Sequence, residues 1–476
     1  MPALSNRLSR WTLLFFGCAL VNFVAAQALM LAGVSWPFQP MFASGTLIVV
    51  HLLTLGWLLL LMLGALFQFI PVITSNILPS QRLELVTLGA VEAGLLLMIC
   101  GFIGLGLGNA AIARCLPVGG ALVIVGVLVA CYDIGVPLLQ AKPMTLPARM
   151  VSTGLVFLLV TITLGLLFAL TINLPALAAP LGKLLASGVG YHALAGLGGW
   201  FTLTAMGVTY KLVPMFTLAP EERGLVGELV DALATAGFAL ALIFGLLGIW
   251  VAAPAVHLVE LAGYALVAVA VGIYLWDIVR IYRTRRRKLI ELHNKAAVGA
   301  FVALGACVLM AVVLLGLQRF TQQVAIFVFL VMFGWLSGLG LTQLYKIVPF
   351  LAWLGMFGTR LGRGPVPRVQ DLVDENHSYP WFIVYFAGVA LAVIAAFAGE
   401  REYFFRTGLG LSLLATLGLA VEYWRARHGY YETRKKTATS AAAPFAMQPR
   451  AAGALSAVCK PAVSILDKQG VSHEHN

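Results

Sequence analysis

Two histidines lie inside long apolar stretches of the chain, where an ionisable side chain is costly and is therefore a candidate functional residue. His51 opens the stretch HLLTLGWLLLLMLGALFQFIP, and His192 lies in a second stretch of similar character. Neutral imidazole is a strong ligand for haem iron or copper. His51 and His192 are thus candidate ligands for a haem or a metal ion. The alternative for each is a structural hydrogen bond to a carbonyl or hydroxyl group inside a helix bundle.

A further pair of ionisable residues is a candidate proton relay. His257 and Glu260 are three residues apart, so in a helix they share one face. Membrane proteins that conduct protons place such groups at intervals along a path; the alternative is a purely structural pair. Other acidic residues are scattered along the apolar stretches, namely Glu92, Asp133, Glu228, Asp231 and Asp277.

Membrane helices must position these residues, because the composition excludes a soluble globular chain. Hydrophobic residues make up 61% of the 476 positions, charged residues make up 11%, and the mean hydropathy is +0.95. A helix needs about 20 apolar residues to cross a bilayer. We expect an all-α integral membrane protein with twelve transmembrane helices, near residues 12–33, 46–71, 83–105, 115–138, 151–173, 185–214, 223–250, 255–281, 295–317, 323–350, 378–398 and 404–424.

The distribution of lysine and arginine predicts the orientation, because basic loops stay on the cytoplasmic side. Most basic residues fall on one side of the expected spans, which places both termini in the cytoplasm and suggests a bacterial inner (plasma) membrane protein. The net charge of +12 then reflects topology and not nucleic-acid binding. We interpret the basic run at 283–288 as a topology determinant; the alternative is binding of anionic lipid headgroups. Residues 1–437 form the membrane domain, and 438–476 are expected to be a disordered cytoplasmic tail.

An internal repeat organises the membrane domain. Three stretches align without gaps: GWLLLLMLGALFQFIP, GWFTLTAMGVTYKLVP and GWLSGLGLTQLYKIVP. The tryptophan and the proline are 14 positions apart in each copy, since 71−57, 214−200 and 349−335 are equal. The copies occupy the second, sixth and tenth expected helices. The chain is therefore predicted to consist of three four-helix units, at about 12–138, 151–281 and 295–424.

Three four-helix units, with a histidine shortly before the glycine-tryptophan pair, resemble subunit I of the haem-copper oxidase superfamily. The resemblance covers most of residues 12–424. It is strongest to divergent cytochrome c oxidase subunit I-like membrane proteins, in the segments YKLVPMF (210–216), YKIVPFLAW (345–353) and VPRVQDLVDE (366–375).

The resemblance implies a set of cofactor ligands that this chain only partly retains. His51 matches the haem ligand of the second helix, and His192 matches a copper ligand of the sixth. The two ligand positions of the tenth helix are occupied by Phe329 and Phe327, and residues 223–250 contain no histidine. The usual haem-copper dinuclear centre and its three-histidine copper site are therefore not expected. A single haem, such as haem b, would be five-coordinate or would take a second ligand such as Met332.

Three functions from different classes follow from these observations. The first is a single-haem protein for electron transfer or for sensing O2 or NO. The second is a non-catalytic assembly or regulatory partner of a respiratory or denitrification complex. The third is a transporter of a small solute or metal. If the chain is an enzyme, it is a respiratory-type oxidoreductase. Phosphate-binding, zinc-protease and serine-hydrolase motifs are missing from the sequence.

Overall fold

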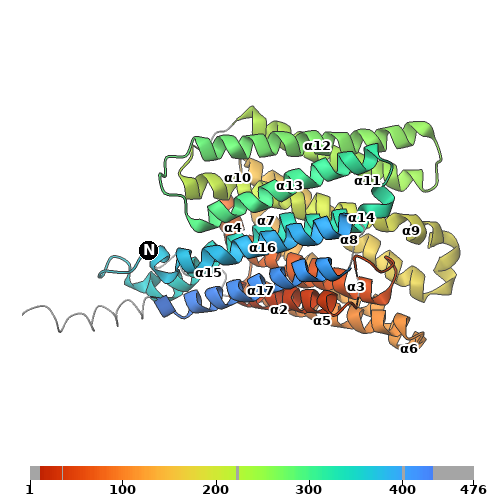
Figure 1. The fold of residues 1–476 in the computed structure, drawn as a ribbon, viewed down its shortest axis with the longest axis horizontal. Coiled ribbons are helices and arrows are strands. Elements are labelled where there is room, and N and C mark those ends of the chain that lie inside the picture. The colour runs from red at the N-terminus through yellow and green to blue at the C-terminus, as the bar shows by residue number, and fades with distance from the viewer. Residues whose placement is uncertain (1–10, 35, 221–223, 399–401, 432–476) are drawn as a thin grey trace, which may run out of the picture. The chain divides into compact units, whose positions relative to one another are not determined.

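The computed structural model describes residues 11–34, 36–220, 224–398 and 402–431. Within these ranges the regular structure is helical and contains no strand (Figure 1). The expectation of an all-α chain is therefore confirmed for the described residues. The tail predicted at 438–476 lies outside them.

The helices follow one another with short connections. In chain order they are α2 (Thr12–Leu31), α3 (Ser44–His51), η1 (Leu52–Leu59), α4 (Leu60–Thr74), α5 (Gln81–Gly106), α6 (Ala110–Ala113), α7 (Cys115–Gln140), α8 (Leu146–Asn173), α9 (Pro175–Ala193), η2 (Leu194–Thr202), α10 (Leu203–Thr217), α11 (Leu225–Gly248), α12 (Pro254–Arg283), α13 (Leu292–Gly316), α14 (Phe320–Phe329), η3 (Leu330–Ser337), α15 (Gly338–Phe357), η4 (Gly358–Arg360), η5 (Val369–Leu372), α16 (Glu375–Phe397) and α17 (Glu402–Arg427).

Eleven helices in the described part of the chain are long and apolar enough to cross a membrane. They match eleven of the twelve expected spans, and the exception is the helix over residues 175–217, which contains the expected span 185–214. Glycine, threonine and His192 dilute its apolar content. Most of α10 is buried inside the protein, so it faces other helices and does not need an apolar, lipid-facing surface. The twelfth span stays a prediction.

Each copy of the repeated motif begins in a π-helical segment. The glycine-tryptophan pairs lie in the π-helical segments η1, η2 and η3. In each copy the backbone then continues as an α-helix that contains the motif proline. π-Helical turns are rare and are often found at functional sites. All three tryptophans, Trp57, Trp200 and Trp335, are fully buried. The three copies therefore share a backbone irregularity as well as a sequence pattern.

Two of these tryptophans tie the π-helical segments together. The Trp57 indole N–H donates to the Ser337 hydroxyl at 2.8 Å, and the Trp335 indole N–H donates to the Thr202 hydroxyl at 3.2 Å. Each acceptor lies two positions after the tryptophan of its own copy. In the first copy that position is Leu59, whose side chain has no acceptor, and the Trp200 indole N–H is buried with no hydrogen-bond partner among the described residues. η3 is thus joined to both η1 and η2 by an indole hydrogen bond. In the described part of the chain, no such bond forms at the interface, or seam, between η1 and η2.

A close glycine–glycine contact recurs in three helix pairs. The most extensive helix pairs are α5 with α7, α11 with α12, and α16 with α17. In each pair two glycines face one another so closely that a Cβ on one would meet the carbonyl oxygen of the other at 2.8 Å or less; the pairs are Gly94 with Gly119, Gly237 with Gly263, and Gly388 with Gly408. Small residues allow such close helix approach in membranes. This recurrence supports the predicted division into three units.

The indole hydrogen bonds make a prediction about stability. Replacing Trp57 or Trp335 with phenylalanine should cost about 0.6–1 kcal/mol more than the same change at Trp200, because only the first two lose a hydrogen bond. Thermal unfolding in detergent, followed by the loss of the helical circular-dichroism signal, measures the difference. Trp200→Phe is the matched control, since it removes a similar ring area. Equal losses for all three variants would contradict the assignment.

Candidate functional site

His51 is the last residue before the π-helical segment η1. Its ring Nδ1 lies 2.7 Å from the carbonyl oxygen of Leu47, one helical turn earlier. A carbonyl can only accept, so this nitrogen must carry the proton, and Nε2 keeps a free lone pair. The ring also packs against Phe102 of α5, with 4.9 Å between centroids. The side chain is therefore oriented, half-buried and in the tautomer that suits a metal ligand.

His192 has the same arrangement on a different helix. Its Nδ1 donates to the carbonyl oxygen of Thr161 in α8 at 3.0 Å, which again leaves the lone pair on Nε2. Phe168 packs edge-on against the ring at 5.7 Å between centroids. Gly165 lies under the ring, where an added Cβ would come 3.1 Å from the imidazole Cε1. The absence of a side chain at Gly165 makes room for the imidazole.

His51 and His192 interact electrostatically. A charge on His51 is felt electrostatically at His192, although the two residues are far apart in sequence. Neither Nε2 has a hydrogen-bond partner among the described residues. Both imidazoles thus keep a free Nε2 lone pair.

The number of available protein ligands restricts the chemistry. No group of three or more histidine, cysteine, aspartate or glutamate side chains that could hold a metal ion occurs among the described residues. A structural zinc site needs about four such ligands. Haem iron needs only one or two, because the porphyrin supplies the others. The donor set formed by the two histidines therefore fits a haem better than a closed metal-ion site.

The tenth-helix positions that the resemblance assigns to haem ligands are filled by packed aromatic rings. Phe329 is 1% exposed and stacks on Phe333 at 4.4 Å between centroids, and its ring also contacts Trp36 and Phe405. Phe327 packs on Phe320 at 5.4 Å. Met332 is buried in the apolar core.

The candidate relay contains more groups than the sequence pair. His257 Nδ1 lies 3.2 Å from Glu260, and the same carboxylate accepts from the hydroxyls of Tyr191 at 3.0 Å and Tyr264 at 3.4 Å. Tyr191 immediately precedes His192. The cluster therefore extends from the exposed His257 to the helix that carries the second candidate ligand. Tyr264 follows Glu260 by one helical turn and could have been anticipated, whereas Tyr191 comes from another helix and left no signal in the sequence.

The remaining membrane carboxylates have local partners. Asp231 and Glu228 pair with Arg149, Asp277 pairs with Arg280, Asp133 accepts from the Ser80 backbone, and Glu92 accepts from the Asn22 amide. These contacts connect neighbouring helices or helix ends, which accounts for the groups without assigning them a transport path.

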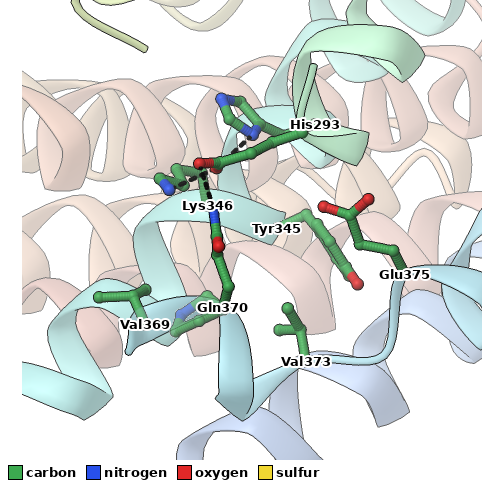
Figure 2. A pocket seen from close by; sticks show the side chains of 9 residues that line it. His293, Tyr345, Lys346, Val369, Gln370, Val373 and Glu375 are labelled. Carbon is green, nitrogen blue, oxygen red and sulfur yellow. Dashed lines mark hydrogen bonds and ion pairs between the residues drawn. The ribbon is translucent and has the colours of Figure 1, made fainter. Parts of the chain in front are cut away.

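At the opposite end of the same repeated helices, the motif lysine of the third copy lines a pocket (Figure 2). Lys346 Nζ lies 2.5 Å from the Glu291 carboxylate, which also pairs with Arg287 at 2.5 Å and accepts from the Gln370 amide at 2.8 Å. Gln370 belongs to the segment VPRVQDLVDE that the sequence analysis singled out. Figure 2 shows this segment forming one wall, with His293 and Tyr345 opposite. The two motifs thus meet around one buried carboxylate.

The surroundings of Glu291 stabilise its charged form. Burial by itself raises the pKa of this carboxyl group, but the hydrogen bond and positive charge of Lys346, together with the Gln370 amide, outweigh it, so the pKa lies below the ordinary value of 4.5. A carboxyl group whose pKa is lowered on folding contributes stability above its unfolded pKa and loses that contribution as the pH falls through its folded pKa. Glu291 is therefore expected to stabilise the protein at neutral pH.

Glu291→Gln should lower the free energy of unfolding by about 2 kcal/mol at pH 7, because it leaves two partly buried cations, Lys346 and Arg287, without their carboxylate. The loss should shrink as the pH falls below 4.5, where protonation removes the same charge from the wild-type protein. Melting curves between pH 3.5 and pH 7 test this. Glu402→Gln, which removes an exposed pair with Arg406, is the control and should have little effect. A pH-independent loss for Glu291→Gln would assign it to packing instead.

Comparisons with known proteins leave the family of this chain open. No protein-family model matches the sequence, and no curated protein matches it either.

Proposed function

We propose that this chain is a divergent relative of haem-copper oxidase subunit I that binds a single haem between His51 and His192, for electron transfer or for sensing O2 or NO. The observation that carries the proposal is the pair of imidazoles. Each has its Nδ1 proton held by a backbone carbonyl and its Nε2 lone pair free, and they come from the equivalent helices of two predicted units. The proposal includes twelve spans arranged as three four-helix units.

The residues around the pair have roles suited to such a cofactor. When bound, the haem supplies an iron that can change oxidation state or bind a diatomic gas. The carbonyl groups of Leu47 and Thr161 fix the ring orientations and make the imidazoles better donors. The rings of Phe102 and Phe168 present apolar surfaces beside the ligands, which limits access of water to them.

The broken symmetry of the indole bonds favours the same location. η3 is bonded to both other π-helical segments, but η1 and η2 are not bonded to each other, because Leu59 cannot accept from Trp200. A flat cofactor can separate two helices only where few direct contacts oppose it. His51 and His192 lie in the chain shortly before these two π-helical segments.

Absorption spectroscopy of the purified protein tests the proposal. Protein from haem-replete cells should give a pyridine haemochrome spectrum of haem b with about one haem per chain. His51→Ala and His192→Ala should each convert the six-coordinate, low-spin spectrum to a high-spin one or abolish haem binding, because each removes one axial ligand. His257→Ala is the control, because its ring is largely exposed, and should leave the spectrum unchanged.

Two results would contradict the haem proposal. One is a colourless protein from haem-replete cells, and the other is a haem spectrum that neither ligand variant alters. Copper analysis of the same samples separates a copper ion held by the two histidines from a haem.

A non-catalytic role in assembling a respiratory or denitrification complex is the second candidate. The packed Phe329 cluster favours it, because the place of two family ligands is filled by apolar rings. A haem-free protein that co-purifies with a membrane partner in mild detergent would select this function. For transport, the paired carboxylates offer no specific support.

The site also fits a definite placement in the cell. We propose that the protein spans the bacterial inner membrane with both termini in the cytoplasm, so that the Glu291 pocket faces the cytoplasm and the histidine pair lies toward the other side. The basic residues at the pocket end of the helices support this orientation.

A further inference from the structure

Four exposed cations gather at the end of α12 and in the loop that follows it. This basic patch consists of Arg283, Arg285, Arg286 and Lys288, and each of the four is exposed. None forms an ion pair with a carboxylate in the described part of the chain. Their neighbours behave differently, since Arg280 pairs with Asp277 and Arg287 pairs with Glu291. The patch therefore presents uncompensated positive charge to its surroundings.

Apolar side chains are exposed beside the basic patch. Leu289 is 84% exposed and Leu218 is 59% exposed. The two loops that carry them are joined by a hydrogen bond from the Arg287 N–H to the Thr217 carbonyl at 3.1 Å. On α12 itself, Trp276 is 58% exposed, and the Arg280 guanidinium lies 5.5 Å from its ring centre. Aromatic residues with basic neighbours are typical of the membrane-water interface.

The helix below the patch faces lipid along its length. Only 22% of the apolar window of α12 is buried inside the protein, the lowest share among the eleven candidate spans. In Figure 1, α12 runs along the upper edge of the drawn helices. The exposed cations therefore stand directly over a lipid-facing surface and not over the protein core.

We propose that the basic patch binds the headgroup of an anionic phospholipid. Its phosphate lies against the arginines, which suit phosphate through their planar arrangement of donors, and its acyl chains lie along the exposed apolar face of α12. Charge complementarity and the adjoining lipid-facing helix favour a lipid over an acidic protein. The exposed Leu289 has an apolar environment in such a complex. This site is independent of the histidine pair and of any haem.

Lipid addition to the full-length protein in mild detergent tests the proposal. Phosphatidylglycerol should raise the melting temperature by about 3 °C, and native mass spectrometry should show retained lipid, whereas phosphatidylcholine should do neither. Arg283→Gln/Arg286→Gln should lose at least half of the shift. Arg283→Lys/Arg286→Lys keeps the charge, so it should retain most of the shift and guards against a change in topology.

The exposed pair Arg360→Gln/Arg363→Gln, in another loop with the same loss of charge, is the matched control and should keep the full shift. An equal response to phosphatidylcholine would overturn the proposal, as would an undiminished response in Arg283→Gln/Arg286→Gln. A soluble polyanion that reproduces the shift without lipid would also overturn it, because it would identify an acidic macromolecule as the partner.

Discussion

The hydrogen bonds between buried indole groups and hydroxyl groups hold the centre of this membrane protein together. A polar N–H inside a membrane protein has little access to water, so a hydrogen-bond partner within the protein stabilises it. Trp57 and Trp335 find theirs in Ser337 and Thr202, on the neighbouring copy of the motif. These two hydrogen bonds hold η3 next to both η1 and η2. The packing of the surrounding helices then follows from three central helices whose relative positions are fixed.

The same interaction explains where the structure departs from threefold symmetry. The first copy has Leu59 where the others have a hydroxyl, so Trp200 has no acceptor and the seam between η1 and η2 stays less tightly joined. The residues at the candidate ligand positions also differ between the first two copies and the third. His51 and His192 belong to the two copies whose π-helical segments are not joined by an indole hydrogen bond in the described part of the chain, whereas Phe329, on the third copy, is packed among aromatic rings.

The regular features of this architecture could be predicted from sequence, because they depend on spacing along the chain. The apolar stretches predicted eleven of the candidate spans, and the alignment of Trp57, Trp200 and Trp335 identified three segments that share a π-helix. The π-helical geometry itself had no sequence signal. The contact of Tyr191 with Glu260 depends on long-range helix packing. The helix over 175–217 shows the limit of hydropathy, since a span surrounded by protein need not be strongly apolar.

The opposite ends of the repeated helices follow different constraints. Three positions before the motif proline, Gln68 donates to the Thr12 hydroxyl at 2.7 Å and Lys346 pairs with Glu291. Thr12 begins α2 and Glu291 immediately precedes α13, so both bonds tie a motif helix to the start of the first helix of its own predicted unit. The bond is neutral in one copy and ionic in the other, yet it joins equivalent elements. At the pocket end, different side chains make the same contact between a motif helix and the start of a first helix. At the histidine end, the π-helical backbone is the same but the side chains that precede it differ. At the pocket end, the first and third copies are thus each tied to the start of the first helix of their predicted unit.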